Sequence, residues 1–322
     1  MGPMTKATPP RKPRDRRAWY QAAFALGLNA WIPSWFKGGI FQGGIKGVCV
    51  PALNCYSCPS ALGACPIGAL QTFLAGLRFN LSIAERKFGL YVVGFMAAVG
   101  SAVGRMPCGW VCPFGFIQEL FYKIPTPKLR LPHVMTYFRY VVLATMVVAL
   151  PLLVVDEFGY GQTWFCKWIC PAGTLEAGIP LILLKADLRP LVGFMYYWKI
   201  GLLALFAGWF VFSQRPFCRT VCPLGAFWGL FNRGSLLRMA VDDEKCTLCD
   251  KCHQDCPVEI KIYEKANSPD CVRCLRCVSS CKFGAISYEF LGKKEVAPDL
   301  TGSGVSRSGP SKARRSGSET RF

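Results

Sequence analysis

The sequence predicts an α-helical membrane domain followed by a small α+β domain that is rich in cysteine. Three observations lead to this fold class. Of the 322 residues, 52% are hydrophobic, which is more than an ordinary soluble domain contains. The apolar residues gather into long stretches, and eight of the 18 cysteines fall in one polar segment near the C-terminus. This composition excludes a disordered chain, and the length argues against a secreted disulfide scaffold.

Four apolar stretches approach the ~20 residues with which a helix crosses a bilayer. They predict a polytopic membrane domain with four or more transmembrane helices, at Ala18–Trp35, Phe88–Gly104, Tyr137–Val155 and Leu191–Ser213. Weaker segments predict short re-entrant or amphipathic helices, at Pro66–Leu77, Pro113–Ile124 and Leu175–Leu184. The last long stretch contains Lys199 among aromatic residues. This setting favours a side chain that reaches towards the membrane interface over a functional intramembrane lysine.

Composition divides the chain into four regions. They are a basic cytoplasmic arm (1–17), a membrane domain (18–237), a cysteine-rich domain (238–291) and a disordered basic tail (292–322). Basic residues remain on the cytoplasmic side of a membrane, so the arm places the N-terminus there. The first apolar stretch lacks a small-residue cleavage site. An uncleaved anchor is therefore favoured over a signal peptide, and Arg16-Arg17 is a poor match to a twin-arginine signal.

The cysteine-rich domain contains two copies of one spacing. Cys246-x2-Cys249-x2-Cys252-x3-Cys256-Pro257 is the run of bacterial two-cluster ferredoxins, and Cys271-x2-Cys274-x2-Cys277-x3-Cys281 repeats it. In such runs the fourth cysteine ligates the other cluster. We therefore assign Cys246, Cys249, Cys252 and Cys281 to one [4Fe–4S] cluster, and Cys271, Cys274, Cys277 and Cys256 to a second. The fold predicted for this region is a two-cluster, bacterial ferredoxin-like α+β domain.

A zinc site is the alternative for these cysteines, but it would use four ligands in two separated pairs, and the doubled run does not match that pattern. Lys282 stands where a proline follows the first run, which leaves the ligands intact and changes the local turn. His253 lies between ligands and is predicted to be a surface loop side chain.

The membrane region repeats a Cys-Pro-x-Gly motif roughly every fifty residues, which indicates a duplicated unit. The motifs begin at Cys65, Cys112, Cys170 and Cys222. Three of them belong to Cys-x3-Cys-Pro pairs, namely Cys108/Cys112, Cys166/Cys170 and Cys218/Cys222. Cysteines four apart on a helical turn project to one side, and proline suits the first turn of the next helix. Two such pairs supply four thiolates, enough for one further cluster or thiophilic metal site. Buried packing and disulfides are the alternatives.

The first repeat departs from this pattern, because Ala61 occupies the place of the first cysteine before Cys65. Cys55 and Cys58, in Cys55-x2-Cys58-Pro59, are candidates to replace the missing ligand. Cys49 is the remaining candidate and is otherwise expected to be a free thiol.

Together, the membrane helices, the Cys-x3-Cys-Pro motifs and the double ferredoxin run resemble the membrane-bound polyferredoxin family over roughly residues 18–290. That family includes the quinol-dehydrogenase membrane component of periplasmic nitrate reductase systems. The resemblance implies electron transfer between a quinone pool and a redox partner protein. The chain contains neither a glycine-rich dinucleotide fingerprint nor a Cys-x2-Cys-His haem site. It is therefore expected to depend on partner proteins at both ends.

Four spans would place both termini in the cytoplasm of a prokaryote, with the protein in the inner membrane. Cys108/Cys112 and Cys218/Cys222 would then lie beside the ferredoxin-like domain, and Cys166/Cys170 outside with the N-terminal cysteines. Arg78, Arg86 and Lys87 oppose this topology, because they would lie outside. If the weaker segments also cross, all four motifs move to one face.

The favoured function is an electron-transfer subunit of a quinol-linked oxidoreductase, although no residue can be assigned to a quinone site. One alternative is a metal-handling or oxidase-assembly factor whose thiolate pairs bind or reduce copper. Another is a redox-sensing regulator. The net charge of +19 lies mainly in the arm, the tail and the loops at the membrane face. It therefore indicates a membrane surface rather than a nucleic acid as its partner.

Overall fold

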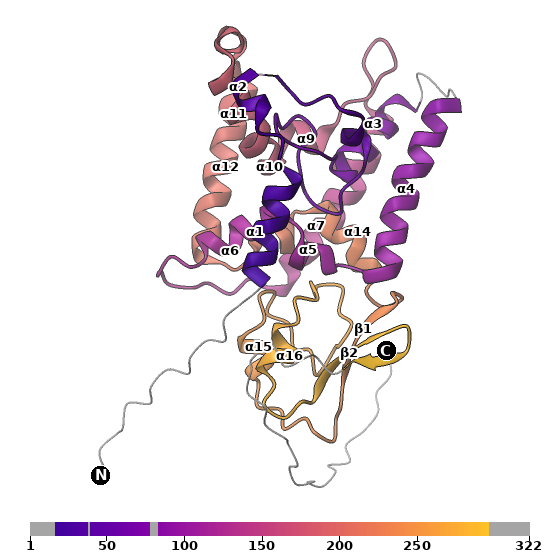
Figure 1. The fold of residues 1–322 in the computed structure, drawn as a ribbon, viewed down its shortest axis with the longest axis vertical. Helices are drawn as coiled ribbons and strands as arrows, with labels where there is room; N and C mark the ends of the chain where they lie inside the picture. The colour runs from indigo at the N-terminus through magenta and orange to yellow at the C-terminus, as the bar shows by residue number, and fades with distance from the viewer. Residues whose placement is uncertain (1–16, 38, 78–82, 296–322) are drawn as a thin grey trace.

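The computed structural model describes residues 17–37, 39–77 and 83–295. Figure 1 shows a domain of roughly parallel helices standing on a smaller C-terminal domain that contains the strands. The predicted basic arm, apart from Arg17, and nearly all of the predicted basic tail lie outside the described residues.

The first apolar stretch does not form one long helix. The structure divides Ala18–Trp35 between α1 (Arg17–Leu28) and the short α2 (Pro33–Lys37). Asn29 ends α1 by donating from its side-chain amide to Ala25 O and Asn54 Oδ1, and Pro33 cannot continue the helix. Twelve residues of helix extend about 18 Å, less than the ~30 Å of a bilayer core. The expectation of one continuous anchor helix is therefore wrong.

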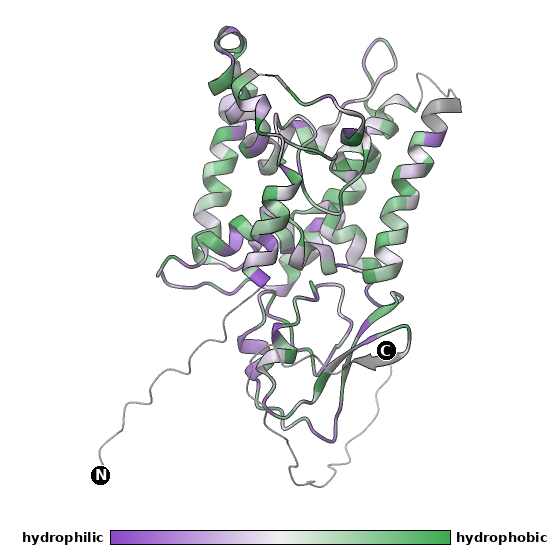
Figure 2. Cartoon of the chain, viewed as in Figure 1, coloured by the Kyte–Doolittle hydropathy of each residue, from purple (hydrophilic) through white to green (hydrophobic). Residues whose placement is uncertain are grey.

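Three longer helices form the frame of the helical domain. They are α4 (Ile83–Val103), α12 (Phe194–Phe212) and a continuous helix over His133–Leu153. The last of these is built from η2 (His133–Tyr137), α7 (Phe138–Val142), η3 (Leu143–Ala149) and α8 (Leu150–Leu153). Of the described helices, His133–Leu153 and Phe194–Phe212 are long and apolar enough to cross a membrane. Figure 2 shows hydrophobic residues predominating along α4 and α12 and polar residues gathering towards the C-terminal domain.

The three weaker apolar segments form short helices, although the third begins at Pro171, before the predicted Leu175, and a fourth short helix that was not among the predicted segments begins at Pro223. Each begins at the proline of a Cys-Pro-x-Gly motif. These helices are α3 (Pro66–Gly76), α6 (Pro113–Phe121), α10 (Pro171–Gly173) continued by η4 (Thr174–Gly178) and α11 (Ile179–Leu184), and α14 (Pro223–Phe231). A one-turn helix precedes three of them, namely α5 (Met106–Trp110), α9 (Trp164–Trp168) and α13 (Pro216–Thr220). Two 3-10 turns complete the domain, η1 (Gly44–Gly47) and η5 (Ala186–Leu191).

The C-terminal domain is an antiparallel three-stranded sheet with two short helices. The strands are β1 (Leu237–Val241), β2 (Ile286–Phe290) and β3 (Lys293–Glu295), in the order β1-β2-β3. The helices are α15 (Lys251–Gln254) and α16 (Arg276–Ser280). Met239 on β1 lies opposite Tyr288 on β2, and Met239, Ile262 and Ile286 form the small core. Because β1 starts at Leu237, the last residue predicted for the membrane domain already belongs to this sheet.

One apolar core runs through the helical domain and reaches the C-terminal domain. It includes Leu53, Phe114, Phe165 and Trp228, and it extends to Val272 of the C-terminal domain. Polar contacts strengthen the same junction. Arg273 donates to Val103 O at the end of α4, and the Trp110 indole donates to Arg273 O. The two domains are therefore packed together with a fixed geometry.

Candidate functional site

The cysteines of the C-terminal domain line two adjoining cavities, as their spacing predicts. One cavity is lined by Cys246, Cys249, Cys252 and Cys281, which we name set 1. The other is lined by Cys256, Cys271, Cys274 and Cys277, named set 2. Cys252 also lines the second cavity and interacts electrostatically with Cys277. The fourth cysteine of each run, Cys256 or Cys281, therefore lies with the first three cysteines of the other run.

The loops around both cavities share an unusual backbone conformation. Leu248 and Asp250 in the first run, and Arg273 and Leu275 in the second, all have φ between 48° and 59°. They occupy equivalent positions between the cysteines. Left-handed residues that alternate with right-handed ones turn successive N–H groups into a concave anion-binding nest. This strain in non-glycine residues recurs in both copies and suits an anionic group in each cavity.

Lys282 does not disturb the second loop. Gly284 N donates to Cys281 O, just as Glu259 N donates to Cys256 O after the first run. Glu259 and Gly284, each three residues after a fourth cysteine, both adopt positive φ. The turn therefore forms without proline. His253 lies in α15 and is half-buried, so the prediction of a surface loop side chain is wrong.

The helical domain brings two Cys-x3-Cys-Pro pairs together next to the C-terminal domain. Cys108, Cys112, Cys218 and Cys222, named set 3, are all buried and interact electrostatically with one another. The first pair lies where α5 meets α6, and the second where α13 meets α14. Segments about a hundred residues apart in sequence therefore supply one set of four sulfurs.

The third pair combines with cysteines of the N-terminal loop. Cys166 and Cys170 interact with Cys55 and Cys65, and these four residues are named set 4. Figure 1 shows α9 and α10, which carry the pair, in the part of the helical domain farther from the strands than α5 and α14. The structure thus brings Cys55 to the place left by Ala61. Cys58 lies outside the set, with its sulfur against Asn29 and Ser60, and the backbone of Cys49 bonds to Tyr91.

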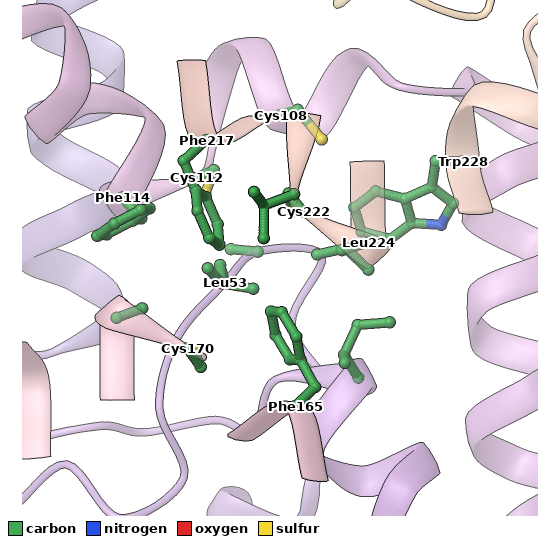
Figure 3. Close-up of a cluster of buried hydrophobic side chains, with 14 of the residues drawn as sticks. Leu53, Cys108, Cys112, Phe114, Phe165, Cys170, Phe217, Cys222, Leu224 and Trp228 are labelled. Atoms are coloured by element: carbon green, nitrogen blue, oxygen red, sulfur yellow. The ribbon is translucent and has the colours of Figure 1, made fainter. Parts of the chain in front are cut away.

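Sets 3 and 4 are neighbours across two consecutive residues of the N-terminal loop. The backbone N–H of Leu53 faces the sulfur of Cys112, and the backbone N–H of Asn54 faces that of Cys65. Figure 3 shows Leu53 between Cys112 and Cys222 on one side and Cys170 on the other. Arg215 links set 3 to set 2, because it interacts with both Cys218 and Cys274. The four sets therefore succeed one another in space, from set 1 to set 4.

The cysteine of the Cys-Pro-x-Gly motif has the same local role in every repeat. Cys65, Cys112, Cys170 and Cys222 are each the N-cap of a helix that starts with proline. A helix N-terminus carries partial positive charge and stabilises a thiolate. Close approach requires the motif glycine at Gly225 but not at Gly68. A Cβ atom on Gly225 would lie 2.6 Å from Arg105 Nη2, whereas one on Gly68 would make ordinary contact with Cys166 Sγ at 3.9 Å.

Two buried arginines border set 3. Arg105 and Arg215, each three residues before the first cysteine of a pair, are fully buried and interact with cysteines of the set. Arg215 Nε donates to Glu119 Oε1 at 2.7 Å, and Arg17 and Arg276 also pair with Glu119. Burial raises the pKa of Glu119, but these arginines outweigh burial and hold its pKa at about 2. The carboxylate is therefore ionised at neutral pH and ties the arginines into the domain junction.

Set 4 has a different charged environment. Lys199 does not extend to a membrane interface as expected, because its Nζ donates to Cys166 O at 3.1 Å and its charge acts on Cys166 and Cys170. Glu176 also borders the set, since its Oε2 accepts a hydrogen bond from Cys55 N at 2.6 Å, and burial raises the pKa of this carboxyl group to about 8. The lysine therefore belongs to the cysteine site, and its flanking aromatic residues gave a misleading signal.

The donor sets fit iron–sulfur clusters better than a single metal ion. Among the described residues, no three His, Cys, Asp or Glu side chains converge closely enough to hold one ion. A cubane cluster instead takes one thiolate at each of four separate iron atoms, so its ligands stand further apart. None of the ten cysteines in the described helical domain forms a disulfide. Arg105 Nε and Arg215 Nη2 are also buried without a hydrogen-bond partner in the described part of the chain, as suits an anionic group in set 3.

Comparison with known proteins agrees with this chemistry. A family model described as a 4Fe-4S binding domain matches about half of the chain, over residues 63–84, 86–132, 138–183 and 194–241. These segments contain sets 3 and 4 except Cys55, and they end before the double ferredoxin run.

Three relatives illustrate the range of similar proteins. An uncharacterized protein of Methanocaldococcus jannaschii is 31% identical over 237 residues, covering 70% of this chain and 78% of the relative. The ferredoxin-type protein NapH of Escherichia coli is 23% identical over 273 residues, covering 80% and 83%. The methylamine utilization ferredoxin-type protein MauN of Methylobacillus flagellatus is 30% identical over 195 residues, covering 60% of each chain. No solved structure matches the chain.

Proposed function

Because the chain belongs to the polyferredoxin-type 4Fe-4S membrane proteins, we propose that it is a membrane-bound electron-transfer protein with four [4Fe–4S] clusters. The observation that carries this proposal is the assembly of sixteen of the 18 cysteines into four sets of four. A [4Fe–4S] cluster supplies one-electron transfer when it is bound. The chain contributes the thiolates, the backbone nests and the order of the sites.

The residues between the sets support a continuous route for electrons. Cys252 adjoins both sets of the ferredoxin-like domain, Arg215 reaches from set 2 to set 3, and Leu53-Asn54 adjoin both sets 3 and 4. The shared apolar core excludes water from the two sets of the helical domain. Set 1 includes the exposed Cys249, so we place a soluble redox partner there. We place exchange with membrane quinone at the helical domain, without assigning a residue to it.

The proposed topology has four crossings, with the ferredoxin-like domain in the cytoplasm of a prokaryote. Three are the long helices α4, His133–Leu153 and α12, and the first is a broken crossing made by α1 and α2 in succession. Support comes from where the helices begin and end. Arg17 at the start of α1 bonds to Gly109 O, the end of α4 meets Arg273, and His133 at the start of the next long helix lies 3.5 Å from Asp270. Buried arginines gather at this end, including Arg105 and Arg219, as expected of a cytoplasmic face. Alkaline phosphatase fused after Gly159 should be active and after Gly234 inactive; the reverse result would contradict the topology.

The decisive experiment counts clusters. Full-length protein purified without oxygen should contain iron and acid-labile sulfide equivalent to four clusters. Cys55→Ser should remove one cluster, whereas the matched variant Cys58→Ser should remove none, because only Cys55 lies in set 4. Iron for only two clusters in the unaltered protein would overturn the proposal.

The quinone step needs a separate measurement. A reduced quinone analogue added to the detergent-solubilised protein should generate the electron paramagnetic resonance (EPR) signals of reduced clusters. Clusters that respond to dithionite but never to any quinol would exclude the quinone link while leaving the electron-transfer role intact.

A further inference from the structure

Two glutamines occupy the same position in two repeats, and both bind a cysteine of the partner repeat. Gln71 follows Cys65 by six residues, and Gln118 follows Cys112 by six. Gln71 Nε2 donates to Cys166 Sγ at 3.4 Å, and Gln118 Nε2 donates to Cys218 Sγ at 3.0 Å. In each case the acceptor is the first cysteine of the pair that completes the set.

The surroundings fix the orientation of both amides. Gln71 Oε1 accepts a hydrogen bond from Phe165 N at 3.0 Å, so its amide nitrogen must face Cys166. Gln118 Nε2 also donates to Phe114 O at 3.3 Å, which holds its nitrogen on the side of Cys218. Both side chains are fully buried. In the other two repeats the same position holds Glu176 and Trp228, neither of which donates to a sulfur; Glu176 accepts from Cys55 N and Trp228 donates to Met96 O.

We infer that Gln71 and Gln118 are positioning residues, which raise the reduction potentials of the clusters bound by set 4 and set 3, respectively. Arg105 and Arg215 make the reduction potential of the set 3 cluster higher than that of the set 4 cluster. This inference rests on the proposed function. A thiolate-bound cubane is anionic and gains one more negative charge on reduction, so hydrogen bonds to its sulfurs and nearby cations favour the reduced state. Burial in a medium of low dielectric strengthens each of these interactions.

The two sets have matched glutamines and unmatched charges. Set 3 adjoins two buried guanidinium groups, which stay protonated at all relevant pH values. The carboxylate of Glu119 pairs with Arg215 and also with Arg17 and Arg276, and Asp270, which interacts with Arg105, is itself paired with Arg139. Set 4 adjoins one ammonium group, on Lys199. Lys46 lies near Cys55, but its Nζ is bonded to Cys58 O outside the set. The electrostatic difference therefore favours an electron on set 3, beside the ferredoxin-like domain.

The test is a redox titration of the full-length protein followed by EPR. The EPR signals are assigned with two variants: Cys222→Ser, which removes the set 3 cluster, and Cys170→Ser, which removes the set 4 cluster. Gln118→Leu should shift only the set 3 signal to a lower potential, and Gln71→Leu only the set 4 signal. Arg105→Gln should lower the set 3 potential, and Arg105→Lys, which keeps the charge, should restore most of it. In the unaltered protein, set 3 should titrate at the higher potential.

Three results would overturn the inference: retained clusters whose potentials do not move in the glutamine variants, equal shifts of both signals, or a set 4 potential above that of set 3. Should a leucine variant lose its cluster, the Arg105→Gln and Arg105→Lys pair decides alone. If the variants keep four clusters with unshifted reduction potentials, this inference is wrong, but the proposed function is not contradicted. Only two clusters in the unaltered protein would remove both.

Discussion

The two domains build the same kind of ligand set in opposite ways. In the ferredoxin-like domain, each run supplies three neighbouring cysteines to one cavity and its fourth to the adjoining one. In the helical domain, set 3 joins segments that lie about 100 residues apart, as the contact between Gln118 and Cys218 shows. A local set depends on backbone turns such as those at Leu248 and Asp250. A set assembled over long range depends on helix packing and on what neutralises its buried charges.

The largest effect should follow from removing the carboxylate that neutralises the domain junction. Glu119→Gln leaves Arg215, which is fully buried, without its ionic partner. Breaking a buried ion pair from one side costs about 3–5 kcal/mol. Thermal unfolding in detergent, followed by circular dichroism, should therefore show a large drop in stability together with loss of the set 3 cluster.

The matched control is Glu264→Gln, which removes an exposed pair with Lys261. Exposed pairs contribute about 0–1 kcal/mol, so this variant should unfold nearly as the unaltered protein does. Equal stability of the two variants would mean that the junction is not held by its charges.

The same comparison explains what sequence reasoning could predict. Spacing alone was enough to group the eight cysteines of sets 1 and 2 as they lie in the two cavities, because those loops are local. The Cys-Pro-x-Gly repeats predicted the short helices and their N-caps for the same reason. Spacing could not decide which pairs combine, or choose Cys55 over Cys58, because both depend on tertiary packing. The environment of Lys199 and the break at Asn29 were misjudged, since apolar composition says nothing about the polar partners Cys166 O and Asn54.

Gln71 and Gln118 were missed for a different reason. A glutamine in an apolar helix carries no strong signal by itself. Aligning the four motifs on their second cysteine would have revealed the shared position six residues later, and a buried amide at a repeated place next to cysteines calls for a partner.

The next largest effect should follow from the loss of a single cysteine, and it should differ between the two domains. Cys281→Ser should remove the set 1 cluster and leave the helical sets loaded, because this cysteine lines the set 1 cavity in the C-terminal domain. Cys222→Ser should remove the set 3 cluster and also weaken the junction, where its set meets Arg105. Iron analysis and the EPR signals of the remaining clusters measure both effects. If Cys281→Ser also emptied sets 3 and 4, the domains would not load independently.

A smaller effect should distinguish the two helical sets from each other. Gly225→Ala places a methyl group 2.6 Å from Arg105 Nη2, and such overpacking costs about 1–3 kcal/mol. Gly68→Ala meets only Cys166 Sγ at 3.9 Å and should be tolerated. Gly234→Ala, with nothing within 4 Å of the new carbon, is the surface control. Thermal unfolding should rank the variants in this order; a Gly68→Ala effect as large as that of Gly225→Ala would remove the steric difference between the sets.

The smallest effect is expected at Cys49, and it tests whether burial alone can make a cysteine look like a ligand. Cys49 is 3% exposed and packs in the same apolar core as Cys112 and Cys170. Its backbone, however, is tied to Tyr91 and bridges to Ala64, which holds it at the edge of the N-terminal loop outside sets 3 and 4. Cys49→Ala should therefore leave the iron content unchanged and lower stability by about 1 kcal/mol, as for a small core truncation. A lost cluster would instead show that the N-terminal loop supplies set 4 through Cys49, and that the position of Cys55 beside Glu176 serves another purpose.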